Sequence, residues 1–434
     1  MRSKSDKKKS LVPRLRFPEF REAGAWEEKK IEDYFSVRSS KRVLQKDWKT
    51  HGVPFYRTRE LVSLYNNEPF SSEIFISEEL FSEIAKKYGF PSEGDFLVSG
   101  VGTLGICYQV KAKDKFYFKD GNVLWYKQNG GIVSSFFYYC FHSDQIQNQI
   151  LGQASISTVG TYTIQNAKVT KFLCPTVEKE QQKIAHCLSS LDEVIGLQAK
   201  KVQALKQHKK GLMQQLFPAE GETTPRLRFP EFREAGAWEV KRLGEIVEEL
   251  QDGNWIESKD QSSVGIRLIQ TGNIGVGGFI QKNNNARYIS EETFKRLNCT
   301  EIFPGDCLVS RLPNPVGRAC IIPAIKERMI TAVDCAIVRF DKNIVVPYIF
   351  ILLSQTPAYL SVAESHAFGS TRKRISRGNL SKLKISIPSL PEQQKIAHCL
   401  SSLDEVIGLE SHKLDALKNL KKGLMQQLFP QEVA

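Results

Sequence analysis

The sequence has no long hydrophobic run. Its longest apolar stretch, Ile344 to Leu353, is short and contains Pro347, whereas a membrane-spanning helix needs about 18 or more apolar residues. Residues 1–10 are basic but lack the apolar core of a secretory signal. The nine cysteines form no C-x-x-C pair, which suits neither a zinc site nor a disulfide framework. We therefore expect a protein of the reducing cytoplasm without a membrane segment.

Motifs for catalysis are also missing. No G-x-x-x-x-G-K-[ST] phosphate loop, H-E-x-x-H zinc motif or G-x-S-x-G nucleophile elbow occurs. The glycine-rich stretch 272–278 favours a strand end and turn over a dinucleotide loop. His186 and His398 each precede a cysteine, but packing beside a helix seam is favoured over a metal site because metal ligands need convergent partners. The sequence thus predicts no catalytic residue and no metal site.

The composition is that of a folded, basic protein. The 434 residues are 41% hydrophobic and 25% charged, which predicts two to four domains and excludes wholesale disorder. Lysine and arginine number 61 against 48 acidic residues, so the formal net charge is +13. Such an excess favours a polyanionic partner, most often nucleic acid, although many basic proteins bind no polyanion.

An internal repeat is the strongest feature of the sequence. Residues 13–27 and 225–239 share the same fifteen letters, PRLRFPEFREAGAWE, at an offset of 212 residues. The segment EQQKIAHCLSSLDEVIGL at 180–197 recurs at 392–409, and KKGLMQQLFP at 209–218 recurs at 421–430, with the same offset. Three blocks at one offset indicate that the chain is a duplicated unit.

Between these blocks the two copies diverge, and only short islands match. Gly94-Asp-Phe-Leu-Val-Ser99 matches Gly305-Asp-Cys-Leu-Val-Ser310, and Thr58 occupies the position of Thr271. The variable regions are therefore expected to share a fold while differing in surface. A pair of this kind indicates one task performed on two targets.

These boundaries predict an α+β protein with a pseudo-twofold internal repeat: two similar globular domains joined by two long antiparallel coiled-coil helices. The predicted segments are a basic tail at 1–12, a first domain at 13–179, a conserved helix at 180–217, a linker at 218–224, a second domain at 225–390 and a second conserved helix at 391–430.

The repeated helix carries a heptad seam. Apolar residues recur at alternating spacings of four and three, the pattern of a coiled-coil strand rather than of a helix packed on its own domain. The seam is Ile184, Leu188, Leu191, Ile195, Gln198, Val202, Leu205, Lys209, Leu212 and Leu216 in the first copy, and Ile396, Leu400, Leu403, Ile407, Glu410, Leu414, Leu417, Lys421, Leu424 and Leu428 in the second.

Two such helices in one chain can pair with each other in an antiparallel arrangement. We predict the register in which paired residue numbers add to 619, because Lys209 then faces Glu410 and Gln198 faces Lys421. Polar seam residues that meet each other fix register at some cost in stability. In this register Leu191, Ile195, Val202, Leu205 and Leu212 face Leu428, Leu424, Leu417, Leu414 and Ile407, respectively.

Side chains suited to DNA contact lie in both variable regions. Arginine reads guanine, asparagine and glutamine read adenine, and lysine and hydroxyl groups contact the backbone. For each residue taken singly a solvated surface position remains the better explanation, but four cations within 372–377 repel one another unless an anion is near. The candidates are Arg57, Thr58, Arg59, Thr158 and Tyr162 in the first region, and Arg267, Gln270, Thr271, Asn273, Arg311, Asn314, Arg372, Lys373, Arg374 and Arg377 in the second.

The whole arrangement resembles the specificity (S) subunit of type I restriction–modification systems. The resemblance rests on the openings of the variable regions at 26–35 and 238–247, on Gly-Asp-x-Leu-Val-Ser at 94–99 and 305–310, and on Pro388-Ser-Leu-Pro-Glu-Gln-Gln-Lys-Ile396, which is similar to the segment that begins the family's conserved helix.

The first copy departs from this pattern, with Lys179 in place of the second proline. That departure makes the turn before the first conserved helix uncertain.

The resemblance implies two target recognition domains, each reading one half of a split, asymmetric DNA site, with the helices setting the unread gap. It also implies a non-catalytic subunit that holds two methyltransferase (M) subunits, with two restriction/translocation (R) subunits completing the complex. S-adenosylmethionine, ATP and magnesium would then act on those partners. The conserved helices and the repeated PRLRFPEF blocks would form the docking surface.

Three alternatives remain open from the sequence. A freestanding DNA-binding regulator would bind a specific site without a methyltransferase. A pure coiled-coil scaffold would show no salt-sensitive DNA binding. An enzyme with an unrecognised site would need a polar constellation that these motifs do not reveal.

Overall fold

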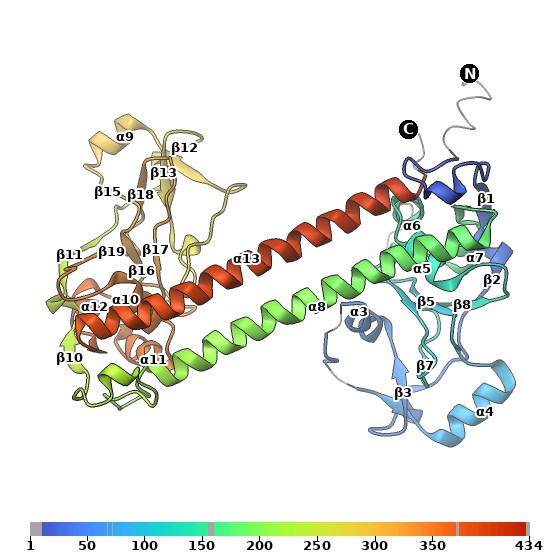
Figure 1. Ribbon diagram of the computed structural model, residues 1–434, viewed down its shortest axis with the longest axis horizontal. Helices are drawn as coiled ribbons and strands as arrows, with labels where there is room; N and C mark the ends of the chain where they lie inside the picture. The colour runs from blue at the N-terminus through green and yellow to red at the C-terminus, as the bar shows by residue number, and fades with distance from the viewer. Residues whose placement is uncertain (1–10, 67, 72, 155–159, 370–372, 431–434) are drawn as a thin grey trace. The chain divides into compact units, whose positions relative to one another are not determined.

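The computed structural model describes residues 11–66, 68–71, 73–154, 160–369 and 373–430 (Figure 1). The chain forms two compact units: unit 1 joins residues up to 199 to residues from 412 onward, and unit 2 holds residues 200–411. Each unit contains one variable domain, the first part of the long helix that follows it and the last part of the other long helix. We refer to residues 11–177 as domain 1 and to residues 225–389 as domain 2.

Each domain is built around a four-stranded antiparallel sheet. In domain 1 the strand order is β2-β8-β5-β6, and in domain 2 it is β11-β19-β16-β17. These strands are β2 (Phe35–Arg38), β8 (Val123–Gln128), β5 (Phe96–Ser99), β6 (Cys107–Gln109), β11 (Val247–Asp252), β19 (Cys335–Phe340), β16 (Cys307–Ser310) and β17 (Ala319–Ile321).

The central strand β5 is buried on both faces because apolar residues occupy both sides of its pleat. Phe96 and Val98 pack with the helical side of domain 1, whereas Leu97 packs with Phe118 on the other side. β16 pairs with β19 in the same register as β5 pairs with β8: Leu97 is opposite Trp125, and Leu308 is opposite Ile337.

A second sheet, of three strands in domain 1 and five in domain 2, covers the other face. Its order is β4-β3-β7 in domain 1 and β12-β14-β13-β18-β15 in domain 2, and the β3–β7 and β13–β18 pairs are both parallel. The strands are β3 (Val53–Tyr56), β4 (Phe75–Ile76), β7 (Tyr117–Phe118), β12 (Gln261–Ser262), β13 (Ile266–Ile269), β14 (Arg287–Ile289), β15 (Glu301–Ile302) and β18 (Met329–Thr331).

Short helices complete each domain, and a two-stranded ribbon connects it to its long helix. The helices are α2 (Ile31–Tyr34), α3 (Thr58–Asn66), α4 (Glu78–Tyr88), α5 (Ser134–Phe141), α6 (Asp144–Ala154) and α7 (Ile164–Val169) in domain 1, and α9 (Glu291–Arg296), α10 (Pro347–Leu353), α11 (Pro357–Ser365) and α12 (Arg377–Ser381) in domain 2. The ribbons pair β1 (Glu27–Lys30) with β9 (Lys171–Cys174) and β10 (Glu239–Arg242) with β22 (Lys384–Ile387).

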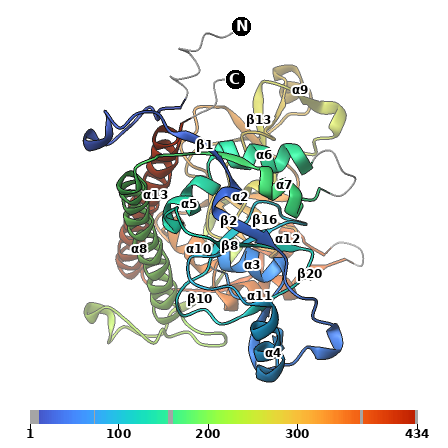
Figure 2. The ribbon, with the colours of Figure 1, turned by 90° about the vertical axis from the view of Figure 1, so that its right-hand side faces the viewer.

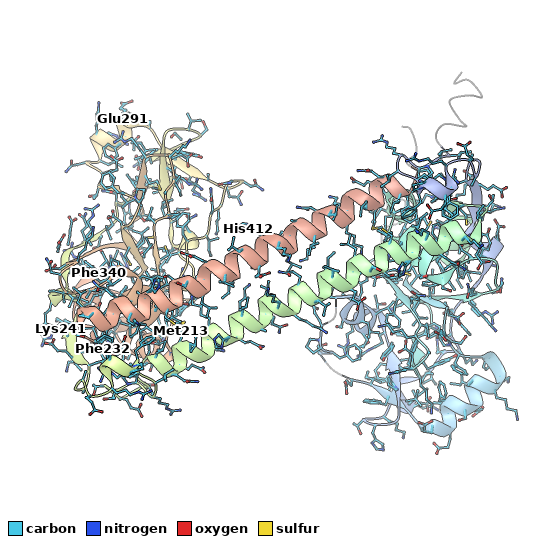
Figure 3. All side chains as sticks on the ribbon, viewed as in Figure 1. Met213, Phe232, Lys241, Glu291, Phe340 and His412 are labelled. Atoms are coloured by element: carbon cyan, nitrogen blue, oxygen red, sulfur yellow. The ribbon has the colours of Figure 1, made fainter. Side chains whose placement is uncertain are left out.

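The order and pairing of these elements confirm the predicted α+β fold, built twice. In Figure 2, α6 and α4 lie at opposite ends of domain 1. Figure 3 labels Phe340 in the core of domain 2, with Met213 of the long helix that follows domain 1 nearby.

The two long helices are α8 (Glu178–Leu216) and α13 (Leu390–Leu428). Their bounds agree with the predicted segments to within two residues. The turn that precedes α8 is preserved despite Lys179, because Gln181 accepts the Val133 amide at 2.9 Å and donates to the Pro175 carbonyl at 3.2 Å. Gln393 makes the equivalent bonds to Val346 and Pro388 in unit 2 (both 2.9 Å).

The repeated PRLRFPEF block is an internal joint in each unit. In unit 1 the Arg16 guanidinium binds both carboxylate oxygens of the buried Glu180 at 2.8 and 2.7 Å. The Leu15 amide donates to the Gln427 carbonyl near the end of α13, and Phe429 packs edge-on against Trp26. The block therefore ties the start of α8 to the end of α13.

Unit 2 repeats this joint with equivalent residues. Arg228 binds Glu392 at 2.8 and 2.7 Å, the Leu227 amide donates to the Gln215 carbonyl, and Phe217 packs edge-on against Trp238. In each copy, the arginine that binds the glutamate and the tryptophan that packs on the phenylalanine hold the fold together. The docking surface expected at this block is therefore limited to its exposed residues.

The helices pair antiparallel within each unit, but the predicted register is wrong. In unit 2 the Lys209 ammonium lies 2.6 Å from both oxygens of Asp404, and Lys201 lies 2.5 Å from Glu410. In unit 1 Lys421 binds Asp192 at 2.6 Å. The lysine–aspartate pairs (209 and 404, 192 and 421) add to 613 rather than 619.

The physical reason is that a heptad seam repeats every seven residues, so a slip of nearly one heptad keeps apolar residues together. The deciding contacts come from Asp192 and Asp404, which lie beside the seam rather than in it. Lys209 is bound to Asp404 and Lys421 to Asp192, so both lysines are held by aspartates beside the seam. The leucine pairs predicted from the 619 register are therefore not supported either.

Candidate DNA interface

The first candidates lie where α3 begins in domain 1. Glu60 is buried and accepts the Arg57 amide, while the Arg57 and Arg59 guanidinium groups bind its carboxylate at 2.9 and 2.7 Å. Burial alone would raise the pKa of Glu60, but the hydrogen bonds from the two arginines outweigh it and the pKa is lowered. Thr58 Oγ1 is buried. Arg59 is the exposed residue of the group, so it is the one placed to turn toward a ligand.

The equivalent turn of domain 2 uses an amide in place of the carboxylate. Asn273 is buried, and its Oδ1 accepts the Gln270 amide at 3.0 Å while its Nδ2 donates to the Ile280 carbonyl at 3.0 Å. The expected base contact of Asn273 is therefore corrected to a role in shaping this loop. Gln270 and Thr271 are half-buried at its edge.

Two predicted arginines of domain 2 are also structural. Arg267 is buried and binds Glu327 at 2.7 Å. Arg311 is buried, donates to the Ile375 carbonyl at 2.9 Å and forms an ion pair with Asp252. Because neither guanidinium faces outward, base contact by these two side chains is corrected to a supporting role.

Arg318, which follows Pro313 and Pro315 in the sequence, supports a second loop. Its Nε donates to the Ile274 carbonyl at 2.7 Å, and its other nitrogens bind the carbonyls of Leu312, Pro313, Pro315 and Thr271 at 2.9 to 3.0 Å. Burial lowers the pKa of Arg318 from its ordinary value. The guanidinium fastens the turn around Asn314, whose own side chain remains exposed.

The described residues of the predicted basic cluster lie on and beside the pair of strands β20 (Ala367–Phe368) and β21 (Arg374–Ile375), which we call the hairpin. Lys373 binds Glu364 at 2.8 Å, and Arg374 lies 3.0 Å from Asp334. Acids of the chain therefore offset part of the repulsion that suggested an external anion. Arg377 is exposed at the start of α12.

Three further candidates complete the comparison. Tyr162 is almost fully buried, and its hydroxyl bonds with Thr170 at 2.8 Å, so its predicted DNA contact is corrected to a core position. Thr158 and Arg372 lie outside the described residues.

The structure adds two aromatic residues that sequence reasoning missed. Trp255 is 67% exposed and Phe368 is 69% exposed. The only sequence signal was an aromatic residue in a polar segment, which does not distinguish a core residue from a surface residue.

These aromatic residues lie on segments that converge on Arg311. Its guanidinium joins the end of β11 at Asp252 to the hairpin at Ile375, Trp255 follows three residues after Asp252, and Phe368 pairs with Arg374 across the hairpin. Phe368 is therefore an exposed ring beside a cation. Trp255 is a second exposed ring, on the segment after β11, where its indole nitrogen donates to Glu257 at 3.3 Å. Exposed cations can contact phosphates, and exposed rings can unstack or wedge bases.

Within the part of the chain that the structure describes, no group of three or more His, Cys, Asp and Glu side chains could hold a metal ion. No described helix is long and apolar enough to cross a membrane.

Comparison with known proteins gives a consistent result. The family model for the type I restriction modification DNA specificity domain matches the chain twice, at residues 24–207 and 236–419. The type I restriction enzyme MjaVIII specificity subunit of Methanocaldococcus jannaschii is 24% identical over 306 residues, covering 67% of this chain and 69% of that protein. A putative type I restriction enzyme specificity subunit of Haemophilus influenzae, S.HindORF215P, is 30% identical over 161 residues, covering 37% of this chain and 38% of that protein.

Two solved structures share the fold. The type I restriction–modification S subunit from M. genitalium aligns with a TM-score of 0.57 and 15% identity, covering 98% of this chain and all of that one (100%). A structure from work on complex assembly and conformational transition of the type I R-M system aligns with a TM-score of 0.56 and 15% identity, covering 94% of this chain and 98% of that one. At this identity the likeness concerns the fold alone.

Proposed function

Because the chain belongs to the family of type I restriction–modification DNA specificity subunits, we propose that it reads a split, asymmetric DNA site with one recognition domain for each half. The chain has two recognition domains and, like its named relatives, is a specificity subunit rather than an enzyme. DNA recognition follows from the family, whereas the division of the site between the domains is our proposal.

One observation carries this proposal: the domains share a scaffold but differ in what they expose. The strand orders are equivalent, yet the turn that holds Glu60 and two arginines in domain 1 holds Asn273 in domain 2. Domain 2 also exposes Phe368 on its basic hairpin and Trp255 after β11. Different surfaces on one scaffold suit two different half-sites, so the complete site would not be palindromic.

We further propose that the long helices hold two methyltransferase subunits. Leu197 is 60% exposed on α8 and its repeat equivalent Leu409 is 71% exposed on α13, and Val194 and Val406 are also exposed. Exposed apolar side chains at equal positions form two matching patches. Two identical patches in one chain suit two copies of one partner.

The remaining components belong to the same proposal. Two restriction/translocation subunits would complete the complex, S-adenosylmethionine would serve the methyltransferase, and ATP and magnesium would serve the restriction subunits. Such a complex acts on DNA in the cytoplasm, the location that the cysteine pattern also favours.

The test is sequencing-based detection of methyladenine in cells that carry this chain with and without its cognate methyltransferase subunit. We expect methylation at one split motif, only when both proteins are present. Replacement of residues 28–179 by another domain of the family should then change one half of the motif and leave the other unchanged.

Three outcomes would contradict the proposal in different ways. A change in both half-sites after replacement of one domain would exclude one reader for each half. Absence of a motif with an active, bound methyltransferase would favour a scaffold. Failure to bind the methyltransferase, with specific DNA binding by the chain alone, would favour a freestanding regulator.

A further inference from the structure

Unit 1 contains a cavity of about 430 Å³ between domain 1 and the last part of α13. One wall is aromatic: Tyr65 and His142 stack with ring centroids 5.5 Å apart and planes inclined by 10°, and Tyr138 and Tyr139 also line the space. The opposite wall is α13, which contributes Lys418, Lys421 and Lys422. The volume suits a ligand the size of a mononucleotide.

The start of α6 opens on this cavity, since Ser143, Asp144 and Gln147 line it. The first intrahelical bond runs from the Gln147 amide to the Ser143 carbonyl, so Ser143 is the N-cap residue and the preceding amides of the first turn have no intrahelical acceptor. A helix start of this kind favours an anion.

Ser143 does not cap the helix, which is unusual for a serine at this position. The residue is only 7% exposed, and its Oγ has no hydrogen-bond partner among the described residues. Nε2 of the neighbouring His142 is likewise buried without a partner in the described part of the chain. Buried polar atoms normally have partners, so these two atoms at one cavity are available to bind a ligand.

Domain 2 provides the contrast. Thr356 occupies the same position before α11, and its Oγ1 accepts the Tyr359 amide at 3.3 Å. Thr356 Oγ1 also donates to the Leu353 carbonyl at 2.8 Å. The helix start in domain 2 is therefore satisfied by its own side chain, whereas the helix start in domain 1 is left open.

The charges at the cavity are mostly positive. Lys421 is engaged by Asp192, but Lys418 and Lys422 are exposed and form no ion pair with the described residues. Asp144 is the one acid that lines the cavity, and it is exposed to solvent. Two available ammonium groups opposite an uncapped helix start form a binding arrangement for a dianion.

From this arrangement we propose that the cavity binds a phosphate group, held by the first-turn amides of α6, the Ser143 hydroxyl and the ammonium groups of Lys418 and Lys422. The aromatic wall gives room for the ring of a nucleotide beside the phosphate. The phosphate could belong to a free nucleotide or to the DNA backbone, and the experiment separates these two sources.

Binding of AMP and of inorganic phosphate to the full chain is measured by isothermal titration calorimetry without DNA. Two variants test the site. Ser143→Asp supplies a good N-cap, so α6 stays stable, but places a carboxylate where the phosphate would lie. Lys418→Gln/Lys422→Gln removes the cations. Lys206→Gln/Lys210→Gln, the repeat-equivalent pair on α8, is the matched control, and thermal unfolding confirms that every variant is folded.

We expect AMP binding to weaken by about tenfold or more in both site variants and by less than about twofold in the control. If neither AMP nor phosphate binds, duplex DNA is titrated at several salt concentrations. Loss of about two units from the salt slope, in Lys418→Gln/Lys422→Gln and not in the control, assigns the phosphate to DNA. Equal behaviour of the site and control variants with every probe would overturn the proposal. Because the AMP titration contains no DNA, its result is independent of the proposed site reading.

Discussion

Units 1 and 2 use identical helix residues but different domain residues to fasten helix to domain. In unit 1 Asp192 binds Lys421 and accepts the Tyr139 hydroxyl at 2.8 Å. In unit 2 its equivalent Asp404 binds Lys209 and accepts the Tyr348 hydroxyl.

The two tyrosines are not equivalent in the repeat, since Tyr139 is near the end of α5 and Tyr348 near the start of α10. Burial, together with the hydrogen bond to the aspartate, raises the pKa of each tyrosine, so both hydroxyls stay protonated donors. The difference teaches that the helix residues are the same in both units, while each variable domain can supply the same contact from another position. Four experiments test how far the two units are equivalent.

The largest effect is expected where the units agree most closely, in the joint. Trp26→Ala and Trp238→Ala should each lower the free energy of unfolding by about 3–5 kcal/mol, because each removes a buried ring from the joint. Calorimetric unfolding of the full chain measures both. Trp255→Ala is the control, since this ring is exposed and its loss should change stability by about 0.5 kcal/mol or less. A large loss in only one joint variant would show that the joints are not equivalent.

An intermediate effect is expected where the surfaces differ. Phe368→Ala should weaken binding of the cognate duplex by about tenfold, because the exposed ring can stack on or wedge between bases. This loss of affinity should depend on the base pairs of one half-site only. Competition with duplexes altered in one half or the other measures this dependence. Leu151→Ala, an exposed apolar residue of domain 1, is the control. A loss that follows both half-sites equally would break the assignment of one domain to each half.

A smaller effect is expected at the fastening tyrosines. Tyr139→Phe and Tyr348→Phe each remove one hydroxyl donor to an aspartate, and each should lower stability by about 1 kcal/mol. Combination with Asp192→Asn or Asp404→Asn in double-mutant cycles measures the coupling within each unit. Coupling between Tyr139 and Asp404 would contradict the contacts described above.

The smallest effect concerns pH and the turn at Glu60. The pKa of Glu60 is lowered in the folded protein, so its contribution is present above its ordinary value of 4.5 and is lost as the pH falls through the folded pKa. The free energy of unfolding of the wild type should exceed that of Glu60→Gln by about 1 kcal/mol or less at pH 7, and by a smaller amount at pH 3.

Asn273 makes the same backbone bond without a charge. The loss caused by Asn273→Ala should therefore be the same at both pH values. If the stability lost in Asn273→Ala also became smaller in acid, as expected for Glu60→Gln, the pH effect would have to come from a group other than Glu60.

The sequence predicted the fold well because the repeat made each inference twice. The long helices and the shared scaffold followed from identical blocks at one offset. The helix register did not follow, because the heptad pattern permits slips and the contacts that choose among them involve Asp192, Asp404 and two tyrosines outside the seam. Those tyrosines lie in the variable domains, where their contact with the helices depends on the folded packing.

The candidate site was harder to predict for a related reason. Arg267, Arg311 and Asn273 have the side chains that read bases, and the same hydrogen-bonding groups also fasten loops. Whether such a side chain points inward depends on neighbours such as Glu327 and Asp252, which are distant in the sequence. Exposure of Trp255 and Phe368 is likewise a property of the folded domain and not of the residue type.

The joint of unit 1 has a consequence for how the protein is made. Phe429 and Leu428 complete the core around Trp26 and Phe136, yet the ribosome produces them after domain 2. Domain 1 is thus synthesised before domain 2 but completed after it. A polypeptide released before these residues would leave aromatic surface exposed in domain 1, a feature that chaperones and proteases can recognise. The position of Phe429 therefore makes synthesis of domain 2 and α13 a condition for a finished domain 1.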